Sequence, residues 1–120
     1  MTNDKVYDLE ERTAVFGENI IDFARILPLN IVNKSLISQV IRSATSIGAN
    51  YMEADGAESK KDFRHKIALC KKESKETKHW MRMIARANKD KKDICKKLWS
   101  EAQELTLIFS SILSPKKRDE

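Results

Sequence analysis

A chain of 120 residues with 41% hydrophobic residues, 34% charged residues, three Gly and two Pro has the size and composition of one helical domain. Its apolar runs are short and interrupted by charge, which excludes a membrane-spanning segment. Residues 1–5 are polar and lack the apolar core of a signal peptide, so we expect a cytoplasmic protein.

The net charge of +5 is unevenly distributed along the chain. Residues 59–97 carry 15 Lys and Arg against 5 Asp and Glu, whereas residues 1–58 carry 5 against 9. The basic character therefore belongs to one third of the chain. A concentration of this kind favours an anionic partner.

Two amphipathic helices are predicted in the first half of the chain. Apolar residues recur at spacings of three and four over residues 7–27 and again over residues 31–54. Pro28 separates the two helices because proline cannot continue a helix. The side chain of Asn30 or of Asn33 is expected to cap the second one.

Two glycines mark particular points of the second helix. Gly48 lies in its middle, at a cost of about 1 kcal/mol relative to alanine, and a glycine there permits another helix to approach closely. Gly56 follows the last apolar position and suits the left-handed conformation that ends many helices.

The third helix has a clear start signal. Ser59 is predicted as its N-cap, and Asp62 three residues later resembles the acidic half of a capping box. From Phe63 to Asn88, the spacing between successive positions of the apolar stripe then alternates strictly between four and three residues. This stripe is polar at three positions, which suggests a wet seam or a second interface: Ser74, Thr77 and Asn88.

A turn at residues 88–90 leads into a fourth helix over residues 91–113, which Ser114 and Pro115 end. Four helices of about 20 residues with short connections predict an all-α, antiparallel, up-down-up-down four-helix bundle. We expect residues 1–120 to form a single domain, with residues 1–6 and 114–120 as frayed tails.

The strongest chemical feature is a basic stripe on the third helix. At 100° per residue, eight cationic side chains fall within an ~80° sector that contains no acid. They are Lys60, Arg64, Lys71, Lys75, Lys78, Arg82, Arg86 and Lys89. Such a stripe would run for ~40 Å, which is long enough to follow a nucleic-acid backbone.

A solvated face that keeps the protein soluble is the alternative interpretation of the stripe. Solvated faces usually carry acids at i,i+4 spacing, and this sector carries none, which favours polyanion binding. No aromatic residue of this helix lies among the cations. Binding is therefore expected to be directed at phosphates and to depend little on base sequence.

The segment from Gln39 to Ile84 also resembles a known family. The matching residues are Arg42-Ser43-Ala44-Thr45-Ser46-Ile47, Asn50, Glu53-Ala54, Ser59-Lys60-Lys61-Asp62-Phe63, Ile67-Ala68-Leu69, Lys72-Glu73-Ser74, Glu76-Thr77 and Trp80-Met81. They resemble the four-helix-bundle family of the bacterial ribosomal RNA intervening-sequence protein and the retroelement accessory variability protein.

The resemblance implies properties that the residues alone do not. It implies a ring-like homo-oligomer, with a pentamer favoured. From the retroelement members it also implies binding to nucleic acid and to a reverse transcriptase. RNA is favoured over DNA only on this basis.

A second set of polar residues matches the family motif and lies away from the apolar stripe of the second helix. Arg42, Ser46, Asn50 and Glu53 share this face, and Trp80 lies beside the acidic edge of the third helix. A subunit interface, a ligand site and plain surface all remain open for this set. Catalysis is the least favoured reading.

Nothing in the sequence predicts a metal, a cofactor or a catalytic site. His65 and His79 are about 21 Å apart on one helix and cannot share a metal ion. Cys70 and Cys95 lie on or beside apolar stripes and are expected to be buried reduced thiols. There is no phosphate-binding glycine loop, no nucleophile elbow and no HExxH motif.

These observations favour a non-enzymatic, homo-oligomeric nucleic-acid-binding accessory protein that acts through the basic stripe. The alternative is an oligomeric scaffold or adaptor, with no nucleic-acid role, whose partner is an acidic protein.

Overall fold

The structure is a computed structural model that describes residues 8–115. These residues form α2 (Leu9–Arg25), α3 (Ile31–Asp55), α4 (Lys60–Ala87), the 3₁₀ turn η1 (Lys89–Lys91) and α5 (Lys92–Leu113). Within residues 8–115 there is no strand, and the predicted all-α class is confirmed. The predicted helix start at residue 7 and the tails at 1–6 and 116–120 lie outside the described residues. Ser114 and Pro115 are non-helical, as expected.

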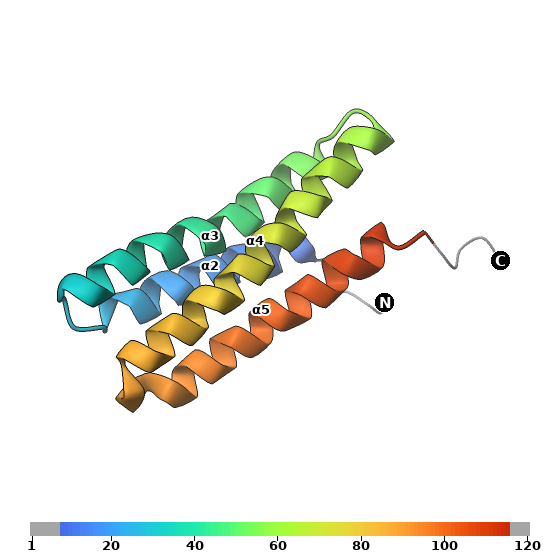
Figure 1. The fold of residues 1–120 in the computed structure, drawn as a ribbon. Coiled ribbons are helices and arrows are strands. Elements are labelled where there is room, and N and C mark those ends of the chain that lie inside the picture. The colour runs from blue at the N-terminus through green and yellow to red at the C-terminus, as the bar shows by residue number, and fades with distance from the viewer. Residues whose placement is uncertain (1–7, 116–120) are drawn as a thin grey trace.

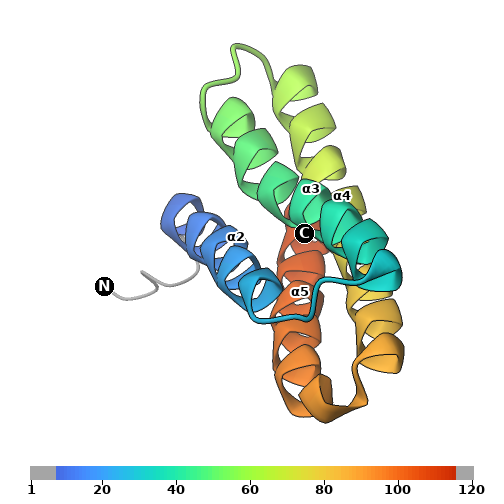
Figure 2. The ribbon, with the colours of Figure 1, turned by 90° about the vertical axis from the view of Figure 1, so that its left-hand side faces the viewer.

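The helices alternate in direction and form the predicted four-helix bundle, which measures 50 × 25 × 23 Å (Figure 1). Each helix packs against its neighbour in the chain: α2 against α3, α3 against α4, and α4 against α5. The backbones of α2 and α5 approach each other much less, and Figure 2 shows α2 diverging from α5 toward its N-terminal end. None of the described helices combines the length and hydrophobicity needed to cross a bilayer.

Side-chain caps fix where the helices begin. Asn30 accepts a hydrogen bond from the backbone N–H of Asn33 at 2.8 Å and is therefore the cap of α3. Ser59 accepts from the backbone N–H of Asp62 at 3.0 Å, which confirms the predicted start of α4. Both side chains satisfy N–H groups that have no partner within the helix.

The predicted left-handed glycine at the end of α3 is wrong. Gly56 has φ −97° and ψ 11°, a conformation that any residue can adopt. Its backbone N–H donates to the carbonyl of Met52 at 3.2 Å, and this bond closes the last turn. The helix therefore ends without the backbone freedom that glycine provides.

The apolar stripes of all four helices meet in one core. Its largest fully buried apolar side chains, each at most 1% exposed, are Phe16, Ile20, Val40, Ile47, Ile67, Met81, Ile84, Leu105 and Phe109. At about 25 cal/mol per Å² of apolar area removed from water, this burial is the main driving force for the bundle.

The polar positions of the α4 stripe form neither a wet seam nor a second interface in this chain, because all three are buried and hydrogen-bonded within it. Ser74 donates to the carbonyl of Cys70 at 2.8 Å. Thr77 donates to the carbonyl of Glu73 at 2.8 Å, and its Oγ1 also lies 2.8 Å from Oγ of Ser43 on α3. Hydroxyls are therefore tolerated at these core positions.

Asn88, the third polar position, pairs with Asn33 across the bundle. Each amide nitrogen donates to the other residue's amide oxygen, at 2.9 and 2.8 Å. The remaining amide hydrogens are donated to the carbonyls of Pro28 and Ile84, at 2.8 and 2.9 Å. The pair thereby links the loop before α3 to the end of α4.

Gly48 allows α2 and α3 to approach closely, as its place in the sequence suggested. A Cβ atom at this position would lie 3.3 Å from Oγ1 of Thr13 and 3.6 Å from the Thr13 backbone. Thr13 is itself buried and donates to the carbonyl of Leu9 at 2.7 Å. A larger side chain at residue 48 would therefore push α2 away from α3.

Candidate nucleic-acid interface

The basic stripe of α4 lies on the flank of the helix that faces α5 and the solvent. The side chains of Lys60, Lys75 and Arg86 are exposed and have no hydrogen-bond or ion-pair partner among residues 8–115. Lys71 is half-buried. Between Lys60 and Arg86 the helix rises about 39 Å, so the charges line one long edge of the bundle.

Two members of the stripe have partners on α5. Arg64 donates from Nη2 to the carbonyl of Leu113 at 2.8 Å, which satisfies an acceptor at the end of α5. Lys78 donates to the side-chain oxygen of Gln103, and its Nζ lies 5.2 Å from the ring centroid of Trp99. The stripe thus combines free cations with cations that hold α4 against α5.

Lys89 does not belong to the helical stripe. α4 ends at Ala87, where the backbone N–H of Asn88 closes the last turn on the carbonyl of Ile84 at 2.9 Å. Lys89 then begins η1. Its place in the stripe came from continuing the 100° spacing through residue 89, whereas the turn that the sequence predicts at residues 88–90 is the one observed.

The sequence interpretation missed the contribution of α5 to this surface. A groove of 450 Å³ between α4 and α5 is lined by Arg82 together with Lys92, Lys96 and Trp99 of α5. The expectation that no aromatic residue lies among the cations was limited to one helix. Spacings of four and three along α5 put Lys92, Lys96 and Trp99 on one flank, and this was the signal available in the sequence.

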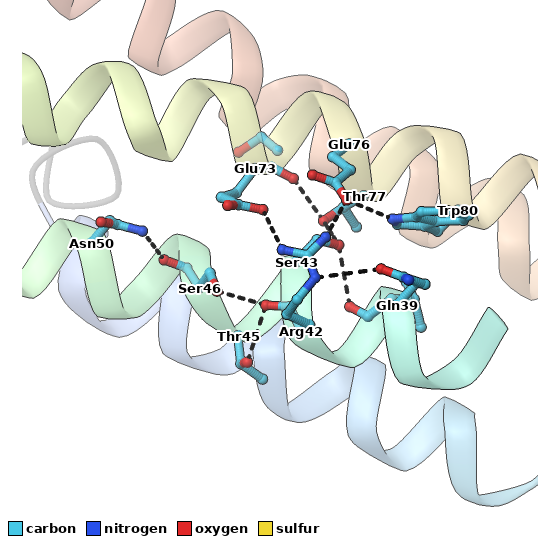
Figure 3. A network of polar contacts seen from close by, with 12 residues as sticks. Gln39, Arg42, Ser43, Thr45, Ser46, Asn50, Glu73, Glu76, Thr77 and Trp80 are labelled. Carbon is cyan, nitrogen blue, oxygen red and sulfur yellow. Dashed lines mark hydrogen bonds and ion pairs between the residues drawn. The ribbon is translucent and has the colours of Figure 1, made fainter. Parts of the chain in front are cut away.

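The family-motif residues Arg42 and Trp80 meet at the boundary of α3 and α4 (Figure 3). Arg42 forms ion pairs with Glu73, at 3.3 Å, and with Glu76. The indole N–H of Trp80 donates to the Glu76 carboxylate at 3.0 Å. An arginine, two carboxylates and an indole therefore join the two helices at their surface.

The other residues of that set lie further along α3. Ser46 donates to the carbonyl of Arg42 at 2.7 Å, and Asn50 donates to the carbonyl of Ser46 at 2.9 Å. Glu53 pairs with Lys66 of α4 at 2.6 Å, and this hydrogen bond raises the pKa of Lys66. The five residues do not converge on one pocket, and a subunit interface here stays a prediction.

An apolar groove of 780 Å³ separates α2 from α5. Among its lining residues, Val15, Ile26 and Ile94 are 38%, 53% and 39% exposed. Arg12 bridges the groove by donating to Glu101 at 2.8 and 2.9 Å and to Glu104 at 2.6 Å. Its hydrogen bond to Glu101 is the main reason why the pKa of Arg12 is raised.

Both cysteines are buried free thiols, as predicted. Burial raises the pKa of Cys70 to about 12 and that of Cys95 to about 11. His65 and His79 are both exposed, and His79 stacks edge-on against Trp80 at 5.0 Å. Across residues 8–115 no group of three or more His, Cys, Asp and Glu side chains is placed to hold a metal ion.

We expect neither thiol of the folded protein to react with a chromogenic disulfide reagent at pH 8. Both thiols should react after the protein is denatured. Thiols with pKa values of about 12 and 11 stay protonated at pH 8, and the thiolate is the nucleophile. Because both pKa values are raised, stability should fall as the pH rises above the unfolded thiol value of about 9. Rapid labelling of the native protein would contradict this burial.

The chain is similar in sequence and fold to known proteins of one family. The family model described as 23S rRNA-intervening sequence protein matches residues 6–111. A crystal structure of a protein with unknown function from the S23 ribosomal protein family of Bacteroides thetaiotaomicron is 27% identical, with a TM-score of 0.76. The match covers 88% of this chain and 97% of that one. No curated protein matches. The chain therefore belongs to the 23S rRNA-intervening sequence protein family.

Proposed function

We propose that this protein is a non-enzymatic, homo-oligomeric accessory protein that binds nucleic acid, with RNA favoured, through the α4–α5 flank. The observation that carries the proposal is the acid-free row of cations from Lys60 to Arg86, extended by Lys92 and Lys96 on the neighbouring helix. Such a row neutralises phosphates and releases their counterions. The family description names 23S ribosomal RNA, which is why RNA comes first.

A binding role rather than catalysis is supported by the chemistry of the described side chains. The two thiols are buried and hold their protons. Glu73 and Glu76, the two acids of α4 that lie between stripe cations in sequence, are paired with Arg42 of α3. Lys60, Lys75 and Arg86, which have no internal partner among residues 8–115, are therefore left to an external anion.

Assembly of identical subunits is supported by exposed apolar side chains outside the α4–α5 groove. The α2–α5 groove exposes Val15, Ile26 and Ile94, and Leu29 and Ile31 in and beside the α2–α3 loop are 84% and 86% exposed. Apolar surface of this kind usually marks an interface. A pentamer is the assembly that the family resemblance implies, and it leaves the α4–α5 flank for nucleic acid in this proposal.

Charge reversal on the flank tests the function. We expect Lys60→Glu/Lys75→Glu/Arg86→Glu to lower the log–log salt slope of single-stranded RNA binding by about two. This corresponds to about 100-fold weaker binding at 0.1 M salt, because three phosphate contacts are lost. Fluorescence anisotropy across a salt series, with single-stranded and duplex RNA and DNA, measures both quantities.

The matched control is Arg25→Glu/Lys34→Glu/Lys97→Glu, three exposed cations outside the basic stripe and the α4–α5 groove. Lys97 lines the α2–α5 groove, so the comparison requires that the assembly state of this variant is unchanged. Each triple variant takes the net charge from +5 to −1, so a difference between them reports the position of the charge. Circular dichroism checks folding, and sedimentation velocity measures the assembly of each protein. An equal loss of RNA affinity in the two variants, or no binding by the wild type, would contradict the nucleic-acid function. It would favour the alternative of a scaffold that binds an acidic protein. A wild type that sediments as a monomer would remove the homo-oligomer from the proposal.

A further inference from the structure

The groove between α4 and α5 combines an aromatic ring with several cations, and this combination suggests a more specific ligand than a phosphate chain. Arg82 comes from α4, and Lys92, Lys96 and Trp99 come from α5. Its buried side is formed by Met81 and Cys95, which are 1% and 2% exposed. The volume of 450 Å³ lies within the range of small-molecule sites, roughly 300–1,000 Å³.

Trp99 differs from the other tryptophan in its surroundings. Trp80 is half-buried and its indole N–H is bonded to Glu76. Trp99 is 38% exposed, and no side chain or carbonyl in the described part of the chain accepts from its indole N–H. A large exposed aromatic side chain without an internal hydrogen-bond partner suits an external ligand.

The ring of Trp99 has a cation over one of its faces. Lys78 lies over one face at 5.2 Å and is itself bonded to Gln103. Gln103 lies one turn after Trp99 on α5, whereas Lys96 lies one turn before it. Trp99 lines the groove, whereas Lys78 and Gln103 do not, so we infer that the ring face turned away from Lys78 borders the groove.

We propose that this groove binds one unpaired nucleotide of a single-stranded RNA. This inference rests on the proposed function. The base stacks on the free face of Trp99, and the adjoining phosphates are bound by Arg82, Lys92 and Lys96. Charge complementarity identifies the occupant, since three cations and the aromatic ring line the groove and no acid does. Bases within a duplex are already stacked on their neighbours, so only single strands gain this contact.

Replacing the ring tests the inference. We expect Trp99→Ala to weaken binding of a labelled single-stranded 12-nucleotide RNA by about 5- to 150-fold, the value of one stacked base. Binding of duplex RNA and the salt slope should stay unchanged because the cations remain. Trp99→Phe should retain most of the affinity, since a phenyl ring also stacks.

A second measurement keeps the test valid if Trp99→Ala folds poorly. In Trp80→Phe the fluorescence of Trp99 is observed alone, and stacking should quench it on titration with the RNA but not with an abasic strand of the same length. Unchanged single-strand affinity in folded Trp99→Ala, equal losses for single strand and duplex, or equal quenching by the abasic strand would each overturn the stacking site. If the wild type binds RNA and charge reversal abolishes this binding, a failed stacking test overturns the stacking site and leaves the proposed function intact. A wild type that binds no nucleic acid overturns both.

Discussion

Phe109→Ala is expected to lower the free energy of unfolding by about 3–5 kcal/mol, the largest loss we foresee for one side chain. Phe109 is 0% exposed and belongs to the core, with its ring centroid 6.4 Å from that of Tyr51 on α3. The variant loses the transfer free energy of the ring, and the surrounding helices cannot close the cavity completely. Urea unfolding followed by circular dichroism, at one protein concentration throughout, measures the loss.

Leu107, two residues earlier on α5, provides the matched control. It is 57% exposed, so Leu107→Ala should change stability by no more than about 0.5 kcal/mol. Phe109→Leu, which retains most of the volume, should cost less than about 1.5 kcal/mol. Similar losses at positions 107 and 109 would mean that the burial described for α5 is wrong.

Asn33→Ala is expected to cost about 2–4 kcal/mol, which is more than a hydrogen bond usually contributes. The loss is large because the substitution leaves the buried amide of Asn88 and the carbonyl of Pro28 without a hydrogen-bond partner, and both groups stay desolvated. The loss is measured in the same urea experiment. It should appear as a lower midpoint with an unchanged slope, because the bundle itself persists.

A double-mutant cycle separates the amide pair from its surroundings. The double variant Asn33→Ala/Asn88→Ala removes both amides, so no amide of the pair is left unpaired, and its cost should fall short of the summed single costs by about 0.5–3 kcal/mol. Additive losses would show that the two amides act independently. The reciprocal bonds at 2.9 and 2.8 Å would then contribute nothing as a pair.

The bounds of the helices could be predicted because local chemistry determines them. Pro28 cannot continue a helix, and the Ser59 side chain satisfies the first free N–H groups of α4. Apolar spacing then identified the core side of each helix. Gly56 shows the limit of such local rules, since its N–H closes α3 on the Met52 carbonyl without a left-handed residue.

Contacts between helices could not be predicted in the same way. In the sequence, three polar residues interrupt the apolar stripe of α4: Ser74, Thr77 and Asn88. Their hydrogen-bond partners lie on preceding turns of α4 or on α3. Such pairs depend on the relative register of two helices, which periodicity within one helix does not contain. The Trp99 groove was missed for the same reason, because Arg82 reaches it from α4 and the other cations come from α5.

The order of packing has a consequence for how the chain acquires its structure. Each helix is packed chiefly on the one that precedes or follows it, and the connections between them are short. Little loop-closure entropy is therefore lost before the first apolar contacts form, and topologies with such local contacts fold within microseconds to milliseconds. On a ribosome, α2 and α3 can pair while α5 is still unsynthesised. The side of α2 that faces α5 in the finished bundle, with its exposed Val15 and Ile26, is then available to other chains from the start of synthesis.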